Sequence, residues 1–244
     1  FTLVEDLFGV EITTWDSAPA WDASVTAHEM HRNGELVGRF YLDMHPRDGK
    51  FKHAAAFPIR VGPTSDGVPV YALARFAVNA ESETIPRALV DKMNAARDFG
   101  TGLGTLRQLT YAYISLDYYN RPPDEVDLDQ LWDVRQSALS PFETLPDTHR
   151  YASLGHLDGY SAIIYTYQWS LAIATDLFTV FETNGLRDTV TAERYRDLVL
   201  APGSSKPAAQ LVHDFLGRDW TPEAYEKKLI DAARAAPPKT KKKK

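Results

Sequence analysis

Cysteine is absent from the 244-residue sequence, so the protein has no disulfide bond and no thiolate that could bind a metal ion. The sequence also has no apolar run near the ~18 residues of a membrane-spanning helix, which excludes a helical membrane protein. No basic segment followed by an apolar one marks a secretory signal. We therefore expect a cytoplasmic location.

No two histidines in the sequence have the interval that the zinc site of a zinc peptidase requires. The nearest approach is His28-Glu29-Met30-His31, in which two histidines flank a glutamate. A zinc peptidase needs its two imidazoles four residues apart on a helix, so that both face one ion. Here they are three apart in a segment with strand character, where side chains that far apart point to opposite faces. We predict a polar hairpin edge and no metal site.

Positive charge is scarce outside the C-terminus. The net charge is −6, yet five of the 27 basic residues are Lys239 and residues 241–244. Without those five, 22 basic residues face 33 acidic ones, which gives a charge of −11. Such a body repels nucleic acid, and we expect neither nucleic-acid nor membrane partners. Residues 239–244 are predicted to be a disordered, solvated lysine tail.

The first third of the chain has strand character. Residues 25–31 and 36–43 alternate between apolar and polar, and the turn residues 32–34 separate them, which predicts a hairpin. Residues 53–57 and the apolar run 68–73 follow. We expect a small antiparallel sheet of three or four strands within residues 20–74.

Helical periodicity begins at Thr84 and Pro86, where a helix start is expected. The fold class is therefore α+β and mainly α, with the sheet followed by a helical bundle over residues 84–236. The segment 160–183 is apolar on most sides, so we expect a long buried helix there. Ser205 is the expected cap of a helix over residues 206–216. Further helices are expected near residues 84–96, 103–113, 127–137, 191–200 and 222–236.

Residues 156–169 form the segment whose side chains are best suited to binding or catalysis. A glycine-containing stretch there leads into a helix rich in tyrosine. Tyrosine hydroxyls in a cleft donate hydrogen bonds to a carbonyl that becomes an oxyanion, and histidine does the same. The alternative is that these aromatic residues belong to the core and satisfy their hydroxyls locally. Composition alone favours this alternative.

The same segment resembles the substrate-binding motif of the thimet oligopeptidase and oligopeptidase A family of zinc metallopeptidases, family M3. Further similarity follows in the family's order from Leu7 to about Leu229. The resemblance implies that residues 1–238 form part of a catalytic lobe that hydrolyses short peptides, with zinc as cofactor. The additional similar segments are residues 38–43, 45–50, 53–55, 99–109, 201–207 and 215–218.

The resemblance also implies roles for single residues. Tyr167 and His156 would be catalytic, with the Tyr167 hydroxyl acting on the transition state. Gly159 and Tyr160 would form a flexible substrate loop. Where the family has a tyrosine pair, this chain has Ile164 followed by Tyr165, so one phenol is replaced by an alkyl group. The implied substrate-binding residues are Gly159, Tyr160, Tyr165 and His53.

One part of the family pattern is missing. The similarity jumps from about Ala74 to about Arg75, past the two helices that carry the family's zinc ligands, and no His-Glu-x-x-His occurs in the chain. No ligand set for zinc is therefore present. Either the polypeptide lacks these helices or the sequence omits residues that the polypeptide contains, and we expect a break within five residues of this junction. The alternatives are an inactive peptide-binding pseudoenzyme and a structural domain without a cleft.

Overall fold

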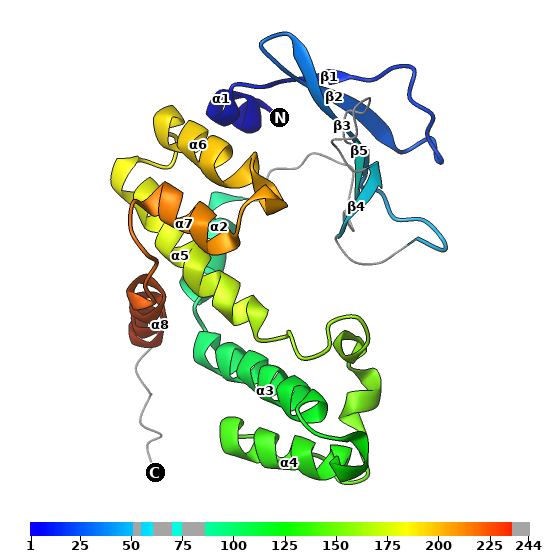
Figure 1. Cartoon of the computed structure of the whole chain (residues 1–244), viewed down its shortest axis with the longest axis vertical. Helices are drawn as coiled ribbons and strands as arrows, with labels where there is room; N and C mark the ends of the chain where they lie inside the picture. The colour runs from blue at the N-terminus through cyan, green and yellow to red at the C-terminus, as the bar shows by residue number, and fades with distance from the viewer. Residues whose placement is uncertain (51–54, 61–69, 75–85, 236–244) are drawn as a thin grey trace. The chain divides into compact units, whose positions relative to one another are not determined.

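The computed structural model describes residues 1–50, 55–60, 70–74 and 86–235. The chain divides into two compact units (Figure 1). The first contains residues 1–84 and 185–203, and the second contains residues 85–184 and 204–244. In the part that the structure describes, no helix combines the length and the apolar character needed to cross a membrane.

A mixed sheet dominates the first unit. Its strands are β1 (Glu11–Thr14), β2 (Thr26–Arg32), β3 (Glu35–Asp43), β4 (Ala55–Arg60) and β5 (Val70–Ala74). Among the described residues their order is β1-β2-β3-β5-β4, with β3 and β5 parallel and the other neighbours antiparallel. β5 lies between β3 and β4, so these two consecutive strands are not neighbours in the sheet. β5 pairs with β3 in parallel and with β4 in antiparallel orientation. Local alternation carries no information about pairing partners, so the sequence did not indicate this order.

The β2–β3 hairpin confirms the expectation from the sequence. Its turn residues, Asn33 and Gly34, have φ values of +51° and +79°. A two-residue hairpin turn with both φ values positive matches the twist of the strands, and Asn-Gly is its preferred sequence. Beneath the hairpin, Val25, Ala27 and Tyr41 form a small buried cluster against Trp15.

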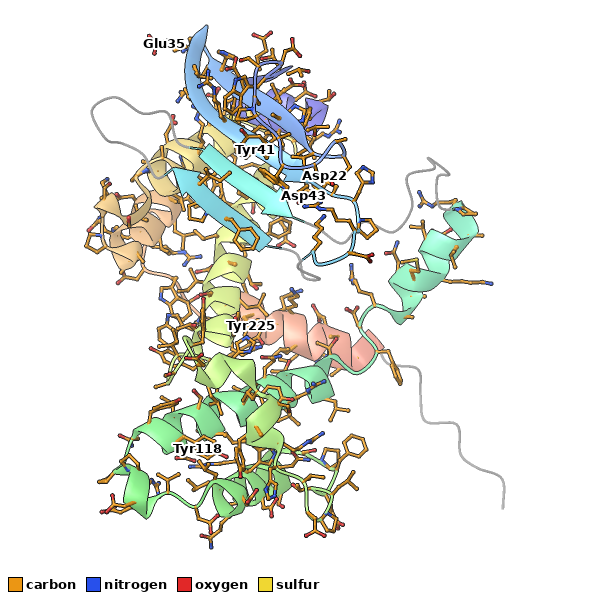
Figure 2. All side chains as sticks on the ribbon, turned by 90° about the vertical axis from the view of Figure 1, so that its right-hand side faces the viewer. Asp22, Glu35, Tyr41, Asp43, Tyr118 and Tyr225 are labelled. Carbon is orange, nitrogen blue, oxygen red and sulfur yellow. The ribbon has the colours of Figure 1, made fainter. Side chains whose placement is uncertain are left out.

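Asp43 at the end of β3 fixes the loop that follows. Its side chain is almost fully buried and accepts hydrogen bonds from the Trp21 indole at 3.1 Å and from the Arg47 guanidinium at 2.6 and 2.8 Å. The Lys50 ammonium lies 2.9 Å from the same carboxylate. Arg47 lowers the pKa of Asp43 most, and Lys50 and Trp21 lower it further. Figure 2 shows Asp43 with Asp22 and Tyr41 at this end of the sheet.

Helices complete the first unit from two distant parts of the sequence. They are α1 (Thr2–Phe8) and α6 (Thr189–Tyr195), and a π-helical turn at Arg196–Leu200 follows α6. α6 packs against α1, and the Arg196 guanidinium donates a 2.6 Å hydrogen bond to the Phe8 carbonyl. The Asp188 side chain caps α6 by accepting a hydrogen bond from the Thr191 N–H at 2.7 Å.

The second unit is helical. Its helices are α2 (Arg87–Ala96), α3 (Thr101–Tyr119), α4 (Leu128–Leu139), α5 (Thr166–Asn184), α7 (Ala208–Leu216) and α8 (Glu223–Ala235). α3 and α4 form an antiparallel pair (Figure 1) around Ile114, Tyr118 and Trp132, and the Tyr118 hydroxyl donates to the Leu128 carbonyl at 2.7 Å. α5 packs against α7 and α8. The Tyr225 hydroxyl of α8 donates to the Gln168 side-chain carbonyl of α5 at 2.5 Å (Figure 2).

Asp176 ties α5 to the segment between α7 and α8. Its carboxylate is 3% exposed and accepts hydrogen bonds from the Arg218 guanidinium at 2.7 and 2.8 Å and from the Thr221 N–H at 2.9 Å. Gly217, with φ +71°, ends α7 and lets the chain turn so that Arg218 reaches Asp176. Arg218 lowers the pKa of Asp176 most, and the Thr221 N–H lowers it further.

The mainly helical α+β class is confirmed, and four expectations need correction. The sheet was expected to be antiparallel with three or four strands within residues 20–74, but in the described part of the chain it has five strands, starts at Glu11 and contains the parallel pair β3–β5. The helix expected from residue 160 begins at Thr166, because Gly159 and Ala162 have positive φ and a right-handed helix cannot pass through them. α5 is not a buried helix, because only Ala172 and Asp176 are buried and its other residues are partly or fully exposed. Ser205 caps nothing, since Pro207 occupies the N-cap position of α7. His53, residues 75–80 at the expected break and the lysine tail lie outside the described residues.

Substitution of Asp43 by alanine should lower the free energy of unfolding of the first unit by about 3 kcal/mol. The reason is that Lys50, only 7% exposed, would keep a buried charge without its carboxylate. Chemical denaturation measures the change, with exposed Asp48→Asn in the following loop as the control. Equal effects of the two substitutions would contradict the anchoring role of Asp43.

Replacing Asp176 by asparagine should destabilise the second unit by about 2 kcal/mol at neutral pH. The folded-state pKa of Asp176 is below its ordinary value of 3.8, so its contribution is complete above pH 3.8 and is lost as the pH falls through the folded value. The difference between wild type and variant should therefore shrink in acid, as thermal melts at several pH values would show. The exposed pair Lys227–Asp231, tested by Asp231→Asn, should change little.

Candidate functional site

One face of α3 is directed toward residues 154–168. Gln108, Tyr111, Ser115 and Tyr119 follow the spacing i, i+3, i+7 and i+11, which places them on one side of a helix. Two of them bond to the loop before α5. The Tyr119 hydroxyl donates to the Leu157 carbonyl at 2.6 Å, and the Ser115 hydroxyl oxygen accepts from the Ala162 N–H at 3.0 Å. α3 therefore holds the loop at two points.

Between these points the backbone takes conformations that most residues avoid. Gly159 has φ +85°, and a Cβ there would meet no atom within 4 Å, so the glycine serves backbone conformation and not close packing. Ala162 has φ +60°, a region that costs an L-residue with a side chain about 1–2 kcal/mol. The loop is therefore built under local strain, which the surrounding contacts must offset.

His156, Tyr160 and Tyr167 form an aromatic cluster at the start of α5. The rings of Tyr160 and Tyr167 stack with centroids 5.8 Å apart, and the imidazole of His156 meets both rings edge-on. The Tyr167 hydroxyl lies 3.3 Å from Nε2 of His156, within hydrogen-bond distance. Tyr160 and Tyr167 are 44% and 45% exposed, so neither residue belongs to the core. The cluster thus combines ordered geometry with access to solvent.

A cavity of about 570 Å³ lies beside this cluster. It includes His156 and Tyr167, but Tyr160 is not part of its wall. Among the residues that the structure describes, no aspartate, glutamate, lysine or arginine lines the cavity, and three aliphatic side chains supply an apolar wall. The Gln168 side chain is oriented by the hydroxyl of Tyr225, which bonds to its carbonyl. The lining residues are Gln108, Tyr111, Leu154, His156, Ile164, Tyr167, Gln168 and Leu171.

Three of the residues implied by the resemblance, His156, Tyr160 and Tyr167, are thus brought together, and Gly159 lies in the loop that joins them. The reason differs from the one that the sequence suggested. A helix over residues 160–183, as expected, would place Tyr160 and Tyr167 on one face because they are seven residues apart. Instead Tyr160 precedes α5, and the bent loop brings its ring onto Tyr167. Tyr165 is 43% exposed and is not a lining residue of the cavity.

The sequence reading did not identify the contribution of α3. Gln108 and Tyr111 line the cavity, and Ser115 and Tyr119 hold the loop. Their common helical spacing was a usable signal, but it could not show which neighbour the face meets. Ile164, which stands where the family has a tyrosine, is only 3% exposed and forms part of the cavity wall.

The residues that the structure describes do not fit a zinc centre. Among them, no three histidine, aspartate or glutamate side chains converge on a point where an ion could bind. His28 and His31 lie on β2, where Nε2 of His28 contacts the Thr26 hydroxyl at 2.9 Å and Nε2 of His31 is 3.7 Å from Glu29. Burial lowers the pKa of His28. His149 pairs instead with Asp129, which raises the pKa of its imidazole.

Comparison with known proteins identifies several oligopeptidases that are similar to this chain. Organellar oligopeptidase A, chloroplastic/mitochondrial, of Arabidopsis thaliana is 33% identical over 152 residues, or 58% of this chain and 19% of the relative. The thimet-like oligopeptidase of Dictyostelium discoideum is 22% identical over 313 residues, covering 94% of this chain and 46% of the relative. Saccharolysin of Saccharomyces cerevisiae is 25% identical over 283 residues, covering 81% and 39%. The chain spans less than half the length of each of these relatives.

A family profile matches most of the chain. The profile of peptidase family M3 matches residues 1–79 and residues 71–230. These two stretches contain both the sheet of the first unit and the loop and helix that carry His156, Tyr160 and Tyr167. The chain therefore belongs to peptidase family M3.

Proposed function

We propose that this chain is the peptide-binding portion of a zinc oligopeptidase and that the cavity beside α5 receives part of a short peptide. The observation that supports this most is the Tyr167 hydroxyl 3.3 Å from His156 at a cavity of about 570 Å³. Clefts that bind small ligands are mostly apolar and contain a few polar groups that fix orientation. The cavity has that character.

The hydrogen-bond donors beside the cavity determine what the proposed site does to a bound peptide. The phenolic hydroxyl of Tyr167 donates a hydrogen bond to a peptide carbonyl, and the imidazole of His156 orients the hydroxyl or donates beside it. Both interactions strengthen if the carbonyl oxygen gains negative charge during attack, which is how oriented donors stabilise a transition state. In this proposal Tyr167 and His156 are the catalytic residues, and Gly159 and Tyr160 form the substrate loop. Tyr165 and His53 remain predicted substrate contacts.

The cavity wall indicates the kind of peptide. Leu154, Ile164 and Leu171 supply apolar surface, and no aspartate, glutamate, lysine or arginine is among the described residues that line the cavity. The Arg107 guanidinium donates to the hydroxyl of the lining residue Tyr111 but is not itself part of the wall. Burying an unpaired charge there would be costly. We therefore propose that an apolar side chain of the peptide enters the cavity and that its backbone meets Tyr167 and His156.

Zinc belongs to the proposed parent enzyme and not to the described part of this chain, where the donor set does not fit it. The alignment with the thimet-like oligopeptidase runs over 313 positions, whereas the chain has 244 residues. At least 69 positions, the difference between these lengths, therefore have no counterpart in this chain. This supports the proposal that a segment of the lobe, with the zinc ligands, is missing from the sequence. The alternatives remain an inactive peptide-binding relative and a domain without a peptide site.

Substitution of Tyr167 by phenylalanine should weaken binding of the peptide acetyl-Gly-Ser-Ala-Phe-Ala-Ser-Gly-amide about fivefold, because one net hydrogen bond is lost while the stacked ring remains. Isothermal titration calorimetry of the purified chain measures the affinity. Tyr113→Phe is the matched control, since Tyr113 is also 45% exposed but does not line the cavity. If the wild-type chain shows no binding, or if both variants bind as the wild type does, the proposed site is wrong.

The 244-residue chain by itself should retain no zinc after dialysis against metal-free buffer, and it should not cleave the same peptide. Elemental analysis measures the metal, and mass spectrometry of the intact chain establishes which residues are present. One equivalent of retained zinc in a protein whose mass matches 244 residues would contradict this prediction. A larger mass with zinc and cleavage would show that the parent enzyme had been purified.

A further inference from the structure

We infer that Ser115 and Tyr119 of α3 are positioning residues that hold the loop of residues 157–162 in the strained shape needed to assemble His156, Tyr160 and Tyr167. The inference rests on the proposed function, because it gives this loop its role in peptide binding. Neither α3 residue touches the peptide in this proposal. Both act through the loop.

The two contacts are arranged as a clamp. Ser115 and Tyr119 are four residues apart, so they lie one turn from each other on the same side of α3. Tyr119 bonds to the Leu157 carbonyl and Ser115 to the Ala162 N–H. One bond therefore precedes Gly159 and Tyr160 in the chain, and the other follows them.

The Ser115 contact is the less replaceable of the two. Ser115 is 0% exposed, so no water competes for its bond to the Ala162 N–H, whereas Tyr119 is 50% exposed. The Ala162 residue has φ +60°, and an alanine released from this bond favours the extended or right-handed regions. A rotation at Ala162 would carry Tyr160 with it. The hydrogen bond between the Ala162 N–H and Ser115 is therefore the part of the clamp that keeps the strained backbone of Ala162 in place.

The aromatic cluster depends on this loop shape. Within the loop the Tyr160 N–H donates to the His156 carbonyl at 3.1 Å, which turns the chain back. Tyr160 then stacks on Tyr167, which is fixed separately by α5. Release of the loop separates His156 and Tyr160 from Tyr167, although α5 itself stays in place. Affinity for peptide and geometry of the cluster should therefore change together.

The test compares five chains: wild type, Ser115→Ala, Tyr119→Phe, the double variant Ser115→Ala/Ala162→Gly and the control Thr110→Val. NMR measures amide hydrogen exchange at residue 162 and ring-to-ring contacts between Tyr160 and Tyr167. Calorimetry measures the affinity for the heptapeptide used above. Ser115→Ala should accelerate exchange at Ala162, remove the ring contacts and weaken affinity about fivefold. Tyr119→Phe should have a smaller effect in the same direction.

Rescue separates positioning from general stability. Glycine adopts positive φ as readily as negative φ, so Ala162→Gly removes the strain that Ser115 opposes. The double variant should regain the ring contacts and an affinity within about twofold of wild type. A general loss of packing in α3 would not be repaired by a glycine in the loop. Thr110→Val is the control, because it removes another buried hydroxyl from α3 whose bond, to the Leu106 carbonyl, stays within the helix.

The outcomes also distinguish this inference from the proposed function. If the wild type does not bind the peptide, the proposed function fails, while the ring contacts still test the clamp. If the ring contacts persist in Ser115→Ala, or if the double variant does not regain them, the clamp is wrong even where peptide binds. Loss of the contacts in Thr110→Val to the same extent would also overturn it.

Discussion

The buried carboxylate of Asp176 is the contact on which the helical unit depends most. It receives three hydrogen bonds, two from Arg218 and one from the backbone of Thr221, and so joins α5 to the chain between α7 and α8. A carboxylate this deeply buried is tolerated only when donors surround it. Because Tyr167, Gln168 and Leu171 lie on the same helix as Asp176, this interaction also fixes one wall of the candidate site.

The sheet unit uses the same physical solution. At the end of β3, the Asp43 carboxylate contacts the indole of Trp21, the guanidinium of Arg47 and the ammonium group of Lys50. These contacts order the loop that follows. The buried apolar clusters of both units are small. The hydrogen-bonded carboxylates Asp43 and Asp176 therefore fix the positions of the neighbouring segments, which so small a core does not do alone. α5 meanwhile carries exposed apolar side chains such as Trp169 and Phe178.

The candidate site follows from constraints that do not come from a single element. α5 supplies Tyr167, α3 supplies two residues of the cavity wall and two bonds to the loop, and the loop supplies His156 and Tyr160. The positive φ values at Gly159 and Ala162 are what let these pieces meet. The chain belongs to peptidase family M3, and the structure shows that His156, Tyr160 and Tyr167, three of the residues that the family resemblance implied, are in contact.

The sequence by itself determined the elements whose signals are local. The Asn-Gly hairpin and the helices that became α4 and α8 could be identified from residue spacing, and the family could be identified from resemblance. The tertiary structure alone decided the place of β5 in the sheet, the late start of α5 at Thr166 and the alignment of α3 with the loop. These features depend on which surfaces meet and on backbone strain held by contacts distant in sequence, such as Ser115 with Ala162. Periodicity shows that a helix has a face, but only packing decides what that face touches.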